Sequence, residues 1–381
     1  MHVSNFLIPQ EITDYIIDHF HDDPPTLAIC ALVCRAWYPA SRHHLFAVVN
    51  ISPRSIATFS DLLLQAPSGW FSIVPILREL SLHLHDDALW LGTLSGLFPE
   101  CTSLRSLKIF FRGGQLTEEV RQTLSTTFHT ITYLALLETT PQRRSLSRDV
   151  EWICTFPHLR KVLISGDYYK DLDISPYARL PSGVQELKLD LPSPATQAFV
   201  QWLLHHTTIP TVSSLLLFRV VDDDVSILKE YLAECRNVLK NLMLFLYQCR
   251  DRAGDFDLSQ HVVLNSIYLS SNGSSSVRTI RDILSTSASL IEMQDVLLRI
   301  SSFELADLYD WASLDRVFTS HRSSSAKITI VMDEDGRYES DLATRLPMCA
   351  KRKQLHFVRA GVHSAASSYV EEVFGYATHH Y

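Results

Sequence analysis

The stretches "VSSLLLFRV" (residues 212–220) and "LKNLMLFLY" (residues 239–247) share one arrangement of apolar residues, and 27 residues separate their starts. Each stretch is apolar at its first, fourth and sixth positions. The same pattern recurs at intervals of 25 to 28 residues, beginning at Leu77, Leu104, Ile131, Leu159, Val184, Val212, Leu239 and Leu264. So narrow an interval indicates a repeated structural unit.

Each unit contains a short alternating segment, which is typical of a strand, and most units continue with a segment of helical spacing. A strand, a helix and a return to a parallel strand within one unit predict an α/β fold with a parallel sheet. A single unit of this kind cannot bury its own apolar face, so stacking of neighbours supplies the core. We therefore predict an irregular β/α solenoid over residues 51–360.

The pattern weakens toward the C-terminus. In the unit near Leu290, Asp295 stands where an inward apolar residue is expected. A longer helix is predicted over residues 303–318, with Ser301 and Glu304 spaced as a capping box. Strands resume at 328–330 and 355–357, and residues 361–381 form a tail with only a weak amphipathic pattern.

The first fifty residues differ from this pattern. After Pro9, apolar residues recur every four positions and predict an amphipathic helix, namely Ile8, Ile12, Ile16 and Phe20. The "DDPP" at residues 22–25 ends that helix and begins a second one, which is expected to run to Pro39. A helical unit of this size has too small a core to be stable alone.

This N-terminal stretch, "IPQEITDYIIDHFHDDPPTLAICALVCRAWYPASRHHLF", resembles the F-box in the form found in mushroom-forming fungi, over about 40 residues. The repeats resemble leucine-rich repeats over roughly 280 residues. They depart from that family three residues after the last leucine of the motif, where only Asn272 matches the usual asparagine. The resemblance implies a helical F-box at residues 5–50, followed by an irregular leucine-rich-repeat-like solenoid.

The F-box resemblance implies the substrate-recognition subunit of an SCF-type cullin–RING ubiquitin ligase. The F-box would bind a Skp-type adaptor, and through it a cullin, while the solenoid would bind an unknown protein substrate. Such a subunit carries no active site and no cofactor of its own. The adaptor-facing residues carried over from the family are Pro9, Ile12, Ile16, Leu27, Val33, Cys34 and Trp37. The alternative is a non-catalytic scaffold that acts without a cullin.

Strand alternation also predicts which residues face away from the helices. In the fifth unit these residues are Lys188 and Asp190, which we expect to form a solvated pair. In the next units they are apolar and would form one exposed patch for the substrate: Leu216, Phe218, Met243, Phe245 and Tyr268. The competing interpretations are that a loop or the C-terminal tail covers this patch, or that the register is slipped by one residue.

Composition narrows the possible functions. The net charge is −8 without a sustained basic stripe, which argues against nucleic acid as the main partner. Seven scattered cysteines favour reduced thiols, and no secretory signal or membrane-spanning run is recognisable. We therefore expect a protein of the cytoplasm or nucleus that neither is secreted nor spans a membrane.

A few residues could suggest a metal site or a catalytic site. Cys30 and Cys34, followed by His43 and His44, could suggest zinc, although small apolar packing explains the cysteines better. The acidic runs at 222–224 and 332–340 lack the ligand spacing of a calcium loop, and the first is better explained as a helix N-terminus. No nucleophile elbow, phosphate-binding glycine loop or zinc-protease motif is present, so a hydrolase has little support.

Overall fold

The structure is a computed structural model. The residues that it describes are 9–64, 74–84, 91, 101–113, 116–138, 140, 144–170, 173–247, 249, 255–272, 276–286, 293–300, 311–320, 326–332 and 339–359. The chain divides into two compact units. Unit 1 comprises Met1–Gln142 and Trp152–Leu159, and unit 2 comprises Arg143–Glu151 and Arg160–Tyr381. The helix α7 (Leu146–Ile153) contributes residues to both units.

Unit 1 begins with three helices and continues with parallel strands. The helices are α1 (Gln10–Asp18), α2 (Pro24–Val33) and α3 (Tyr38–Leu45). The strands pair in the order β1 (Val48–Ile51), β2 (Glu79–Leu84), β3 (Ser106–Phe111) and β4 (Tyr133–Glu138). The connecting elements are α4 (Ile56–Leu64), the short 3₁₀ helix η1 (Val74–Ile76) and α6 (Glu118–Thr127).

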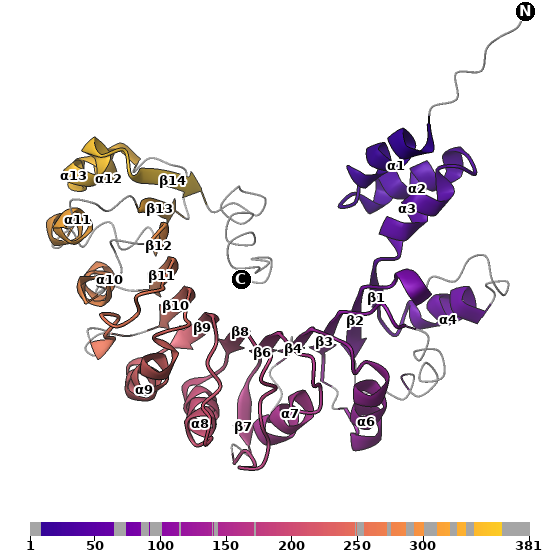
Figure 1. The fold of residues 1–381 in the computed structure, drawn as a ribbon, viewed down its shortest axis with the longest axis horizontal. Coiled ribbons are helices and arrows are strands. Elements are labelled where there is room, and N and C mark those ends of the chain that lie inside the picture. The colour runs from indigo at the N-terminus through magenta and orange to yellow at the C-terminus, as the bar shows by residue number, and fades with distance from the viewer. Residues whose placement is uncertain are drawn as a thin grey trace, which may run out of the picture. The chain divides into compact units, whose positions relative to one another are not determined.

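Unit 2 contains a longer run of parallel strands. They pair in the order β6 (Lys161–Ser165), β8 (Glu186–Asp190), β9 (Ser214–Val220), β10 (Asn241–Tyr247), β11 (Ser266–Asn272), β12 (Asp295–Ile300), β13 (Lys327–Met332) and β14 (Leu355–Arg359). A separate parallel pair is formed by β5 (Arg144–Ser145) and β7 (Tyr168–Lys170). The connecting elements are α8 (Ser193–Leu204), η3 (Asp222–Asp224), α9 (Val225–Cys235), α10 (Ser276–Ser285), α11 (Trp311–Ser320), α12 (Glu339–Arg345) and α13 (Pro347–Lys351). Figure 1 shows α8, α9, α10 and α11 on one side of these strands.

The strands fall where the repeat predicts them. Leu215 of β9, Leu242 of β10 and Ile267 of β11 are direct partners in the register, as equivalent positions of successive units must be. The helices predicted between strands are present as α6, α7, α8, α9 and α10. An α/β fold with parallel strands is therefore confirmed.

Two boundaries differ from the prediction. The strand β12 begins at Asp295, and Val296 takes the position partnered with Ile267. The repeat pattern therefore starts at the buried Met293, not at Leu290, and this unit is complete. The chain also forms β1 before residue 51, because Phe46, Val49 and Ile51 already have the apolar spacing of the repeat.

Some predictions concern segments of which the structure describes only a part. The helix expected over 303–318 is seen as α11, which starts at Trp311. Its proposed capping box at Ser301 and Glu304, and the tail 361–381, lie outside the described residues. The two compact units also do not divide at residue 50, where the sequence places the end of the F-box.

The strands show two different patterns of side-chain burial. Along β3 buried and half-buried residues alternate, as expected for a strand with one face in the core. Along β9 every residue except Arg219 is buried. Both faces of β9 are therefore buried, which explains why β9 and β10 are apolar at nearly every position.

Candidate interaction sites

The N-terminal helices form a small module with a minimal core. Asp23 caps α2, because its side chain accepts hydrogen bonds from the Thr26 backbone nitrogen at 3.1 Å and from the Thr26 hydroxyl at 2.6 Å. The large apolar side chains buried in the described part of this module are Ile17 and Leu27, and both are at most 1% exposed. Because so few side chains are buried, the core of this module contributes little stability.

The second helix is shorter than predicted. It ends at Val33, and Cys34 has extended backbone angles. Pro39 lies in the first turn of α3 and so begins a helix instead of ending one. Cys30 and Cys34 therefore do not lie one turn apart on one helix, as the zinc interpretation required. Cys30 is buried and Cys34 is exposed.

Most of the residues expected to face the adaptor are accessible. Ile12 is 50% exposed, Ile16 is 38% exposed and Val33 is 56% exposed. Pro9 and Cys34 are also exposed, and Trp37 is half-buried. Leu27 is the exception, because it is 1% exposed and belongs to the core of the module.

The first helix has apolar residues on two sides. Its core side carries Thr13 and Ile17, one position further along the chain than the predicted stripe of Ile12 and Ile16. The stripe of Ile12 and Ile16 lies on the exposed side of α1, where residues that face an adaptor are expected. Tyr15, which is 62% exposed, lies beside it.

Sequence reasoning missed two exposed apolar residues of α2. Ile29 is 66% exposed and Leu32 is 87% exposed. The signal was present in the segment "PPTLAICALV", which is apolar on every side of the helix and so cannot bury all of its side chains in a small module. The side chain of Gln10 donates to the Ala36 carbonyl at 2.9 Å and so brings the start of α1 next to the chain that follows α2.

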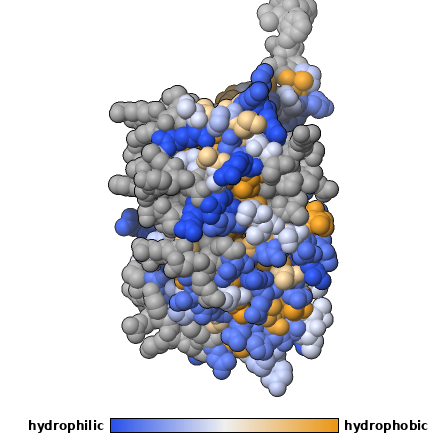
Figure 2. All heavy atoms as spheres, turned by 90° about the vertical axis from the view of Figure 1, so that its left-hand side faces the viewer, coloured by the Kyte–Doolittle hydropathy of each residue, from blue (hydrophilic) through white to orange (hydrophobic). Residues whose placement is uncertain are grey.

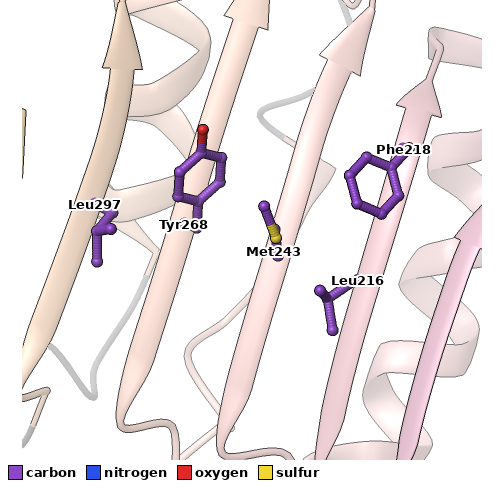
Figure 3. Close-up of a cluster of buried hydrophobic side chains, with 5 residues drawn as sticks. All are labelled: Leu216, Phe218, Met243, Tyr268 and Leu297. Carbon is purple, nitrogen blue, oxygen red and sulfur yellow. The ribbon is translucent and has the colours of Figure 1, made fainter. Parts of the chain in front are cut away.

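The predicted substrate patch is assembled but is not exposed. The register places Leu216, Met243 and Tyr268 side by side on β9, β10 and β11. Figure 3 shows these residues with Phe218 and Leu297 on the face of the strands turned away from the helices. The register is therefore not slipped.

Burial contradicts the expectation of an open surface. Leu216 and Met243 are 0% exposed, Tyr268 is 2% exposed and Phe218 is 4% exposed. Phe245 is half-buried and stacks on Phe218, with ring centroids 4.7 Å apart. These residues form a core cluster in the structure. On the face seen in Figure 2, hydrophobic residues are instead scattered among hydrophilic ones.

The pair Lys188 and Asp190 is also buried, whereas we expected it to be solvated. The Lys188 ammonium lies 2.9 Å from a carboxylate oxygen of Glu186. Asp190 accepts hydrogen bonds from the Arg219 Nε at 2.7 Å and from the Ser165 hydroxyl at 2.8 Å. The charges are tolerated because each has a partner within hydrogen-bonding distance.

Arg219 lies at a bulge in β9. Leu217 pairs with Leu244, but Val220 pairs with Leu246, so two residues of β9 oppose one of β10. Arg219 has a φ of 58°, in the left-handed region. Its guanidinium bonds Asp190, the Asp167 carboxylate at 3.0 Å and the Gly166 carbonyl at 3.4 Å. These contacts offset a backbone cost of about 1 kcal/mol or more.

The acidic run at 222–224 starts a helix, as predicted. It forms η3, directly before α9. The Asp224 carboxylate accepts from the Val221 backbone nitrogen at 3.1 Å and from Ser193 and Gln197 of α8. Burial raises the pKa of Asp224, because the charged form is desolvated. In the second acidic run, residues 333–338 lie outside the described residues.

The cysteines are free thiols. Burial raises the pKa of Cys249 to about 12, and its thiol donates to the Val220 carbonyl. Such a thiol stays protonated and unreactive near neutral pH. In the part of the chain that the structure describes, no three histidine, cysteine or acidic side chains converge on a possible metal position. No described helix is long and apolar enough to cross a membrane.

The fold class is thus α/β with parallel strands, with three helices at the start of unit 1. No model of a known protein family and no curated protein matches the chain.

Proposed function

We propose that this protein is the substrate receptor of an SCF-type cullin–RING ubiquitin ligase. In this proposal α1–α3 act as an F-box that binds a Skp-type adaptor. The parallel strands and helices that follow act as a leucine-rich-repeat-like solenoid that holds a protein substrate. The chain would contribute by holding its substrate near the conjugating enzyme, which is a proximity effect.

One observation carries the proposal. Of the thirteen large hydrophobic residues exposed in the described part of the chain, seven lie between Ile12 and Val33. Burying a side chain such as Leu32 or Ile29 against a partner is worth about 1.5–3 kcal/mol. A weakly stabilised helical module with this much apolar surface is therefore expected to bind a partner through it.

Co-expression with a Skp-type adaptor tests the proposal. Ile12→Asp replaces an exposed apolar side chain of α1 by a charged one, so we expect the complex to be lost. Val262→Asp is the matched control, because Val262 is 57% exposed but lies far along the chain in unit 2. This variant should bind the adaptor like the wild type. Adaptor binding that survives Ile12→Asp would contradict the proposal.

A cullin that co-purifies with the wild-type complex would separate the ligase subunit from a scaffold that acts without a cullin. A ubiquitylation assay in vitro is not required for this distinction, because the two complexes differ in whether they contain a cullin. Trp37 is unsuitable for the test. Its half-buried side chain lies at the start of α3, so its replacement would also disturb the module.

A further inference from the structure

The exposed surface of α1 carries an unequal distribution of charge. Between Pro9 and Cys34 the chain has five carboxylates and no lysine or arginine, the carboxylates being Glu11, Asp14, Asp18, Asp22 and Asp23. The side chain of Asp18 is 62% exposed and that of Asp22 is 89% exposed. This segment therefore carries a net negative charge at neutral pH, and the exposed Arg35 follows it directly in the sequence.

The geometry of the helix places this charge beside the apolar residues. Glu11, Tyr15 and Asp18 are spaced i, i+4 and i+7, so they share one stripe of α1. Ile12 and Ile16 form the adjacent stripe, at i and i+4. The ring of Tyr15 lies against that of His19, with centroids 4.7 Å apart. A partner that covers the isoleucines must therefore approach the carboxylates.

The carboxylates differ in the bonds that they make with other residues of the module. Asp18 pairs with His44 of α3 at 2.7 Å, and Asp14 accepts from Gln10 at 2.6 Å. Asp23 caps α2. Glu11 and Asp22 contribute charge without linking the helices to each other, since the recorded partner of Asp22 is the neighbouring His21. These two residues can be changed with the least disturbance of the module.

We propose that the partner surface covering α1 and α2 is an apolar groove bordered by lysine and arginine side chains. This inference rests on the adaptor-binding role proposed above. Like charges brought together at an interface oppose binding, whereas complementary charges accelerate association. A basic border would therefore be attracted to the acidic stripe, and dissolved salt would weaken that attraction.

The association rate of the full-length chain with the purified Skp-type adaptor tests this inference. For the wild type we expect the rate constant to fall several-fold when the salt concentration is raised from 0.05 to 0.5 M. Glu11→Lys combined with Asp22→Lys should lower the rate constant about tenfold at low salt and abolish most of its salt dependence. The dissociation rate should change less than twofold.

The matched control makes the same change of charge elsewhere. Glu230→Lys combined with Glu234→Lys alters two exposed residues of α9 in unit 2. These substitutions should leave both the rate and its salt dependence near the wild-type values. The neutral variant Glu11→Gln with Asp22→Asn should fall between the wild type and the reversed variant.

The outcomes separate this inference from the proposed function. If the wild type binds and Ile12→Asp does not, but the Glu11 and Asp22 reversal leaves the rate unchanged or raises it, the basic border is wrong and the adaptor role stands. If Glu230→Lys combined with Glu234→Lys lowers the association rate as much, the net charge of the chain is responsible and the inference is also wrong. If the wild type does not bind the adaptor, both proposals fail.

Discussion

Replacing Met243 by alanine tests whether the predicted substrate patch is core. The Met243 side chain is 0% exposed and lies between Leu216 and Tyr268 in the register. Truncating a methionine at such a site leaves a cavity and costs about 2–5 kcal/mol. Against a total stability of about 5–15 kcal/mol for a typical protein, this is a large loss.

Urea denaturation followed by far-ultraviolet circular dichroism measures this loss as a shift of the transition midpoint. Met348→Ala is the matched control, because the same truncation is made where the side chain is 48% exposed. It should change the stability by no more than about 0.5 kcal/mol. Oxidation of the folded wild type by dilute peroxide should likewise modify Met348 well before Met243.

The reasoning would be refuted if both truncations had the same small effect, or if peroxide oxidised the two methionines at similar rates. The Met243 side chain would then face solvent. The patch would again be a candidate substrate surface, as the sequence suggested.

Three further predictions concern buried polar groups of unit 2. Asp149→Ala should lower the free energy of unfolding by about 3–5 kcal/mol, because it leaves the buried guanidinium of Arg144 without this ion-pair partner. A loss below about 1 kcal/mol would show that this ion pair is not buried as described. Burial lowers the pKa of His261, so the unfolded chain takes up a proton near pH 6.5 that the folded chain accepts only at lower pH. The free energy of unfolding should therefore fall as the pH drops from 7 through 6.5, and His261→Gln should remove part of that fall. If the variant had the same pH dependence as the wild type, His261 would not be responsible. Asp190→Ala should cost about 1–3 kcal/mol through the lost hydrogen bonds from Arg219 and Ser165, and an unaltered denaturation midpoint would show that these bonds contribute little.

The sequence predicted the strands well, because their evidence is local and is repeated. The interval between Leu239 and Leu264 already implies the register that joins β10 to β11. The pattern failed at β12, where an alternative start at Leu290 hid the correct one at Met293. A start three residues too early exchanges inward and outward positions, because three is an odd number, so Asp295 was wrongly assigned to an inward position.

The candidate sites were harder to predict because exposure depends on contacts that are distant in sequence. Spacing identified Ile12 and Ile16 as a stripe but could not decide which side of α1 would face the core, since Ile17 is as apolar as either. The same limit applies to Met243. Its neighbours on the sheet follow from the repeat, whereas its burial depends on tertiary packing that the repeat does not encode.

The contrast between β3 and β9 has a consequence for how these strands tolerate variation. In β3 every second residue is half-buried, so polar replacements should be accepted at alternate positions. In β9 nearly every residue is buried, and neither set of alternate positions is free to vary. A saturation scan should therefore give a two-residue alternation of tolerance along β3 and an unbroken block of intolerance along β9. This block includes Arg219, because its guanidinium bonds Asp190 and Asp167.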